Sequence, residues 1–162
     1  MIETISLRPG ITLRCCRDGR FKQGCLTVQF LRPMGREEAA LNALLPAVLL
    51  RGSRKHPDLR SITHALDDLY GASVSTLVRR VGDIQTVGLY CGFLEDRFAL
   101  PGDKILEPTL ALLEELLLDP ATADGAFLPD FVESEQRNLI ATVEGELNNK
   151  QAYAMARIVR TM

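Results

Sequence analysis

The chain has 162 residues, 46% of them apolar and 25% charged, which is the composition of a soluble globular protein with room for one hydrophobic core. Its net charge of −2 gives no electrostatic reason to expect nucleic acid or an anionic membrane as a partner. No secretory signal opens the chain, and its most apolar stretch, residues 39–50, is too short to span a bilayer. We therefore expect a cytoplasmic, bacterial-type protein.

Alternating apolar and polar residues predict three strands in the first part of the chain, at residues 2–7, 11–17 and 26–31. The next segment, residues 38–53, has apolar residues at the spacing of one helix face and is closed by Gly52. Pro46 lies inside this helix and lacks a backbone donor, so we expect it to kink the helix or divide it into two turns.

A second helix is predicted at residues 59–69, with Asp58 as its cap and Tyr70-Gly71 as its end. Two strands, residues 72–80 and 84–92, should then form a hairpin around Gly82-Asp83.

The second half of the chain has helical patterns. A strongly apolar helix at residues 103–118 should be largely buried. Another helix is predicted at residues 129–147, and residues 152–159 continue in helical period. We expect these apolar residues of the last long helix to point inward: Val132, Leu139, Ile140, Val143 and Leu147.

The order of predicted elements is three strands, two helices, two strands and two helices, joined by hairpins instead of crossovers. This order favours an α+β fold with an antiparallel or mixed sheet and helices packed on one face. Residues 1–162 are interpreted as a single domain. The helical pattern still runs at Met162 without a stop signal, so either the last helix frays or the chain is a fragment of a longer protein.

Several segments carry a resemblance to a known family. They are Leu44 to Ser53, Leu66 to Ala72, Leu113 to Pro120, Phe131 to Glu144 and Asn148 to Ala154. Together they resemble the non-catalytic bacterial branch of the insulinase/pitrilysin family of zinc metallopeptidases, some of whose members are named for an association with elongation factor P modification. The resemblance implies the metallohydrolase domain shared by insulinase-like and mitochondrial processing peptidases. It also implies that this chain is an incomplete first domain of a two-domain protein.

In the catalytic members, the first helix carries H-x-x-E-H, with two histidines as zinc ligands and a glutamate as general base. Anchored on Arg51-Gly52-Ser53, the five corresponding positions are Ala43, Leu44, Leu45, Pro46 and Ala47. The family's third ligand is a glutamate on a later helix, for which Glu135 is the nearest match and Glu133 its neighbour. One carboxylate cannot hold zinc alone, so we interpret Glu135 as a solvated helix residue. We predict no enzyme activity, no cofactor, and no catalytic or metal-binding residue.

The remaining candidates for chemistry are two histidines and four cysteines. His56 and His64 could form a zinc or acid–base site with Asp67 or Asp68, but their interpretation as a surface and a helix-face histidine is favoured. Adjacent Cys15 and Cys16 should point to opposite faces of a strand, and one of them could meet Cys25 across the first hairpin. We expect reduced, buried thiols at these positions and at Cys91.

The leading functional hypothesis is that the chain is the silent half of a peptidase assembly. The resemblance implies a catalytic insulinase-like partner subunit that carries H-x-x-E-H, while the silent half supplies wall surface and grips peptide. The hairpin at residues 72–92 is a candidate sheet edge for peptide, although an ordinary interior hairpin is the favoured interpretation. One alternative is a pure assembly or scaffold protein without peptide binding. A weaker one is an enzyme that uses His64 with Asp67 and Asp68. We expect the isolated chain to form a homodimer, symmetric or domain-swapped, that covers an exposed apolar patch.

Overall fold

The computed structural model describes residues 2–145, 148 and 150–161. The elements follow in this order: β1 (Ile2–Arg8), β2 (Ile11–Cys16), β3 (Gln23–Pro33), α1 (Glu38–Leu49), α2 (Leu59–Asp68), β4 (Ser73–Val81), β5 (Ile84–Leu94), the 3-10 turn η1 (Asp96–Phe98), α3 (Leu106–Leu118), β6 (Thr122–Ala123), β7 (Ala126–Phe127), α4 (Pro129–Gly145) and α5 (Lys150–Thr161). The fold is α+β, as predicted.

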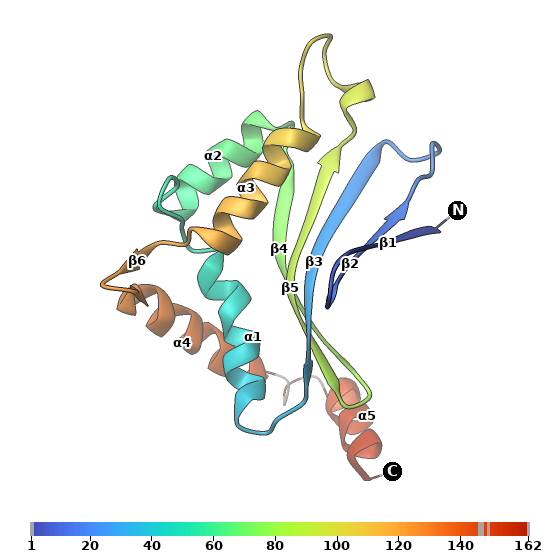
Figure 1. The fold of residues 1–162 in the computed structure, drawn as a ribbon. Helices are drawn as coiled ribbons and strands as arrows, with labels where there is room; N and C mark the ends of the chain where they lie inside the picture. The colour runs from blue at the N-terminus through green and yellow to red at the C-terminus, as the bar shows by residue number, and fades with distance from the viewer. Residues whose placement is uncertain (1, 146–147, 149, 162) are drawn as a thin grey trace.

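A three-stranded antiparallel sheet forms the centre of the fold, with β5 between β3 and β4. β5 pairs with β3 from Gln23↔Leu94 to Pro33↔Ile84, so it has a partner along its whole length on that side. β1 pairs with β2 and β6 with β7, each as a separate two-stranded sheet. All the described strand pairings are antiparallel. Figure 1 shows α1, α2 and α3 on the same side of the central sheet.

The core lies between this sheet and the helices α2 and α3. Alternate residues of β5 point to the helices, and Leu89 and Cys91 are completely buried there. Around Leu89 pack Ile62 from α2 and three leucines of α3: Leu112, Leu113 and Leu116. A full side-chain burial of this kind stabilises a fold by about 1.5–3 kcal/mol per residue, so this cluster holds α2 and α3 firmly against the sheet.

The start of α2 matches the prediction in detail. Asp58 caps the helix by accepting a hydrogen bond from the Ser61 backbone N–H at 2.8 Å. The Ser61 hydroxyl lies 3.3 Å from the backbone nitrogen of Asp58, which completes a reciprocal capping box. These bonds to Ser61 hold the pKa of Asp58 below its ordinary value. After the helix, Tyr70 and Gly71 both take positive φ angles of 61° and 72°, which glycine adopts readily and tyrosine rarely.

Three predictions about the helices need correction. Of the two outcomes expected at Pro46, division of the helix is wrong: α1 continues through the proline as one helix, and the ring is completely buried, so tertiary packing outweighs the lost hydrogen bond. α3 is less buried than its apolar content suggested, since Leu110 and Leu118 are 42% and 77% exposed. The last helices are two separate elements, α4 and α5.

Of the apolar residues expected to point inward from α4, Val132 and Leu139 are half-buried, whereas Ile140 and Val143 are exposed. Ile140 and Val143 are 49% and 57% exposed, and no described residue of α4 is fully buried. The predicted inward position of Leu147 lies outside the described residues. The short hairpin of β6 and β7 was not expected, because its two-residue strands are too short to show an alternating pattern. Among the helices that the structure describes, none has the length and apolar content for crossing a membrane.

Candidate functional site

The positions that correspond to the zinc motif lie on α1 and carry no group that could bind a metal. Pro46 is buried, while Ala43 and Ala47 are half-buried. Alkyl side chains and a proline ring offer no lone pair, and zinc sites in proteins are built from Cys, His, Asp and Glu. Within residues 2–145, 148 and 150–161, no group of three such side chains could hold a metal ion. The residues at this place therefore do not fit a zinc ion.

Glu135, the nearest match to a third ligand, is engaged by the protein itself. Its carboxylate oxygen Oε1 lies 3.3 Å from Nη1 of Arg51, in the turn that follows α1, and its side chain is only 14% exposed. Asn138, on the next turn of α4, donates a hydrogen bond of 3.3 Å to the other oxygen, Oε2. The Arg51 guanidinium also lies over the Phe131 ring, 5.6 Å from its centroid. The interpretation of Glu135 as a solvated residue was wrong, because a cation from the end of α1 neutralises it.

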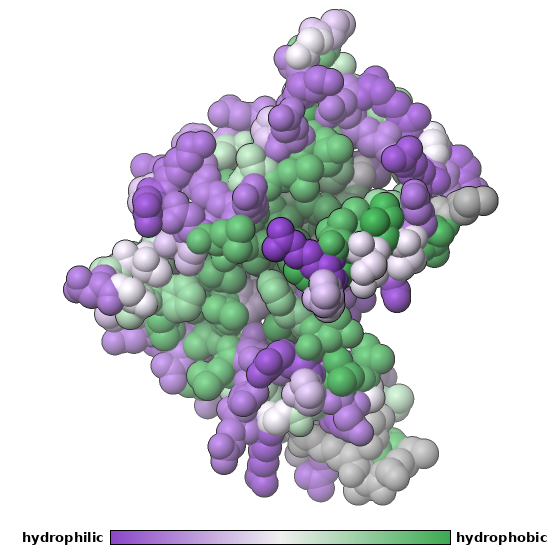
Figure 2. Space-filling view, viewed as in Figure 1, coloured by the Kyte–Doolittle hydropathy of each residue, from purple (hydrophilic) through white to green (hydrophobic). Residues whose placement is uncertain are grey.

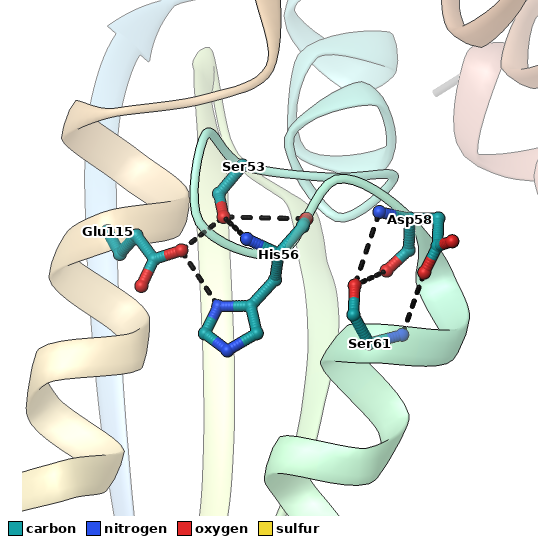
Figure 3. A network of polar contacts seen from close by, with 5 residues as sticks. All are labelled: Ser53, His56, Asp58, Ser61 and Glu115. Carbon is teal, nitrogen blue, oxygen red and sulfur yellow. Dashed lines mark hydrogen bonds and ion pairs between the residues drawn. The ribbon is translucent and has the colours of Figure 1, made fainter.

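The turn between α1 and α2, which we call the junction loop (residues 51–57), contains a second polar cluster that the sequence did not reveal. Ser53 is completely buried, and its hydroxyl accepts a hydrogen bond of 2.8 Å from the His56 backbone N–H. The same hydroxyl donates to Oε1 of Glu115 on α3. His56 Nδ1 lies 2.8 Å from that carboxylate oxygen. Figure 3 shows Ser53 and His56 from the loop meeting Glu115 from the neighbouring helix.

Glu115 is the shared acceptor of this cluster, with a side chain that is 13% exposed. Burial raises the pKa of Glu115, but the hydrogen bonds from Ser53 and His56 and the charges of His56 and Lys55 outweigh burial, so its pKa lies below the ordinary value. An ionised carboxylate accepts hydrogen bonds, so a proton on His56 Nδ1 is directed at it.

Serine, histidine and glutamate are also the residues of a nucleophilic triad, but this cluster does not have that geometry. In a triad, the histidine ring bonds the serine hydroxyl and the carboxylate orients the histidine. Here the Ser53 hydroxyl bonds the carboxylate directly, and Ser53 is 0% exposed, so a substrate cannot reach it. The cluster is a structural link between the junction loop and α3.

Gly52 explains why the junction loop can lie so close to its neighbours. A Cβ atom at this position would lie 2.7 Å from the Pro57 carbonyl oxygen and 3.2 Å from the Phe131 ring of α4. The Gly52 carbonyl accepts a 3.0 Å hydrogen bond from Ala121, after α3. The loop thus joins α1 and α2 in sequence while it contacts α3 and α4 in space.

The alternative site built on His64 is not assembled. His64 is exposed on α2, and within the described residues it forms no hydrogen bond or ion pair with Asp67 or Asp68. The favoured interpretation of His64 as a helix-face residue therefore agrees with the structure. The interpretation of His56 as a surface residue was wrong, since its ring is half-buried against Glu115.

The four cysteines are free thiols. Cys15 and Cys16 lie on β2, which pairs only with β1 among the described strands, so neither meets Cys25 of β3 through a shared sheet. Cys91 is buried as expected, and burial raises the pKa of its thiol. The expectation of burial was wrong for Cys16 and Cys25, which are exposed.

The hairpin at residues 72–92 forms one interior strand and one edge. β5 is the central strand of the sheet, while β4 pairs with β5 alone among the described strands. The outer side of β4 therefore presents a strand edge.

Comparisons with known proteins place these observations in context. No protein-family model matches the chain. Over 160 residues, 99% of the chain, it is 30% identical to a protein of Bacillus subtilis (strain 168) named probable inactive metalloprotease YmfF. The chain spans 38% of the length of that relative. The chain also resembles the crystal structure of a conserved protein from Enterococcus faecalis V583, with a TM-score of 0.87 and 24% identity. The match covers 95% of this chain and 36% of the Enterococcus chain.

The structural match establishes the fold, and the sequence match supports an inactive metallopeptidase-like protein. The word inactive in the relative's name agrees with the prediction that this chain is not an active peptidase.

Removing the charge of Glu115 should reduce the dependence of stability on pH. Because its pKa is lowered in the folded state, Glu115 contributes stability that is fully present above about pH 4.5 and is lost as the pH falls through its folded pKa. We expect the Glu115→Gln variant to be less stable than wild type at pH 7 and to approach it as the pH falls through the folded pKa of Glu115, measured by urea unfolding. Glu114→Gln, at the exposed neighbouring position, is the matched control. A constant difference between the Glu115→Gln variant and wild type across this range would contradict the account.

Breaking the Arg51–Glu135 pair should loosen the contact between α1 and α4. The Glu135→Gln variant leaves the half-buried Arg51 cation without its counter-ion, and we expect a loss of about 1–2 kcal/mol in the free energy of unfolding. Glu133→Gln is the control, since Glu133 is 66% exposed and should change stability by less than about 0.5 kcal/mol. Equal effects of the two substitutions would show that the Glu135 pair stabilises nothing.

Proposed function

We propose that the chain is a non-catalytic member of the insulinase-like peptidase family that acts as the silent half of a peptidase assembly. The observation that carries the proposal is the contact between α1 and α4. At this place the resemblance puts a zinc ion. In this chain α1 carries Ala43 and Ala47, and Glu135 on α4 is neutralised by Arg51 from the junction loop. The name of the Bacillus subtilis relative supports the non-catalytic part of the proposal.

The proposed partner is a catalytic insulinase-like subunit that carries H-x-x-E-H. Part of the helical layer suits such a role, because apolar side chains of α1 and α4 remain exposed: Leu41 is 67% exposed, Leu45 40%, Ile140 49% and Val143 57%. Figure 2 shows apolar surface over the middle of this face of the molecule, where α1, α3 and α4 lie in Figure 1. Exposed apolar side chains that gather on one face favour an interaction with another protein surface. The cytoplasmic location and the two-domain arrangement remain predictions.

Native mass spectrometry of the protein purified from its own cells without chelators tests this role. The proposal predicts a co-purifying chain that carries H-x-x-E-H and one zinc ion per complex. A metal-free homo-oligomer alone would contradict the silent-half role and favour a scaffold protein. Zinc bound to this chain itself would contradict both.

Peptide binding separates the silent half from a pure scaffold, and the free edge of β4 favours binding. An extended peptide could add there as a further strand, held by backbone hydrogen bonds. We expect a fluorescently labelled extended peptide to bind the assembly by fluorescence polarisation, and the same peptide with proline at alternate positions to bind at least about tenfold more weakly, since proline lacks the donor. Equal binding of the two peptides would remove the β4 edge from the proposal.

The isolated chain should self-associate through its exposed apolar residues. We expect a homodimer in size-exclusion chromatography with light scattering, because two copies can cover each other's apolar surface. The double variant Ile140→Glu, Val143→Glu should shift the equilibrium toward the monomer, whereas Glu133→Gln on the same helix should not. A monomeric wild-type chain at high concentration would overturn this expectation.

A further inference from the structure

A cavity of about 300 Å³ opens between α2 and α3, next to the junction loop. Its apolar walls include Ala65 and Leu69 from the α2 side and Leu112 from α3. Its polar lining comes from four residues: Lys55, His56, Asp68 and Glu115. An apolar hollow with a few converging polar groups is the usual form of a small-ligand site.

The polar groups of this lining are available to a ligand. Lys55 and Asp68 form no hydrogen bond or ion pair within the part of the chain that the structure describes, and both are exposed. His56 uses Nδ1 for its contact with Glu115, 2.8 Å away, and its Nε2 has no partner among the described residues. Figure 3 shows Nε2 on the side of the ring that points away from Glu115.

The contact with Glu115 determines what the cavity offers. Because Glu115 accepts from Nδ1, the neutral His56 ring presents the lone pair of Nε2. Hydrogen-bond acceptors therefore come from His56, Asp68 and Glu115, while Lys55 is the one charged donor in the lining. With the His56 ring in its neutral form, the two carboxylates and one ammonium of the lining add up to a net negative charge, which favours a cation.

We propose that this cavity binds an organic cation, with a primary ammonium or guanidinium group on a short apolar stem, of the kind found on lysine and arginine side chains. The charged group donates to Asp68 and to His56 Nε2, and the stem packs against Ala65, Leu69 and Leu112. Glu115 holds the His56 ring in the orientation that accepts. The site does not depend on the peptidase-like role, since none of its lining residues takes part in the contact between Arg51 and Glu135.

The test uses the 162-residue chain and two probes, n-butylammonium and the capped peptide acetyl-Gly-Lys-Gly-amide. His56 and His64 are the two histidines of the chain, so their ring signals are readily separated by NMR. The proposal predicts saturable shifts of the His56 signals with His64 as an internal control. The uncharged analogue n-butanol should bind at least about tenfold more weakly, which is the effect expected for losing a hydrogen bond to a charged group.

Matched variants locate the charge partner. Asp68→Asn should weaken binding of both probes at least about tenfold, while Asp67→Asn, at the adjacent exposed position outside the lining, should leave it unchanged. Binding of the free amine alone would identify a small-molecule amine as the ligand, and binding of the peptide alone a lysine side chain of a partner protein. His56 signals that do not move with either probe, or equal effects of the two aspartate substitutions, would overturn the proposal.

Discussion

The junction loop depends on one largely buried carboxylate, that of Glu115. Glu115 receives the Ser53 hydroxyl and the His56 ring on the same oxygen, and these two residues are themselves joined by a 2.8 Å bond from the His56 backbone N–H to the Ser53 hydroxyl. A carboxylate taken from water without such partners would cost several kcal/mol, so the loop and α3 stabilise each other's position. The loop also links α1 to α2. The bonds to Glu115 therefore connect these two helices to α3, which packs on the core.

The junction loop also contacts α4. Gly52 leaves room for Phe131, and Arg51 reaches over the Phe131 ring to Glu135. The cation thus meets the carboxylate that the family resemblance associates with a metal. Arg51 Nε is buried and has no hydrogen-bond partner within the described residues, so the pair with Glu135 leaves one donor of the guanidinium unsatisfied. Because Arg51 neutralises Glu135, this carboxylate is balanced by the protein itself.

Local patterns in the sequence predicted most of the elements. Alternation identified β4 and β5, and the Asp58 cap and the Tyr70-Gly71 end of α2 have local causes that involve a few neighbouring residues. The polar clusters could not be predicted in this way, because His56 and Glu115 are 59 residues apart, and Arg51 and Glu135 are 84 apart. The exposure of Ile140 and Val143 on α4 was missed for a related reason. Periodicity shows which side of a helix is apolar, but the residues that cover that side are far away in sequence or in another chain.

Zinc titration of the purified chain by calorimetry tests the central claim most directly, with the Glu135→Gln variant measured beside wild type. The account predicts that neither protein takes up zinc stoichiometrically at micromolar concentration, since the α1 positions offer no ligands and Glu135 is held by Arg51. Binding of one zinc ion by wild type that is lost in the Glu135→Gln variant would contradict it.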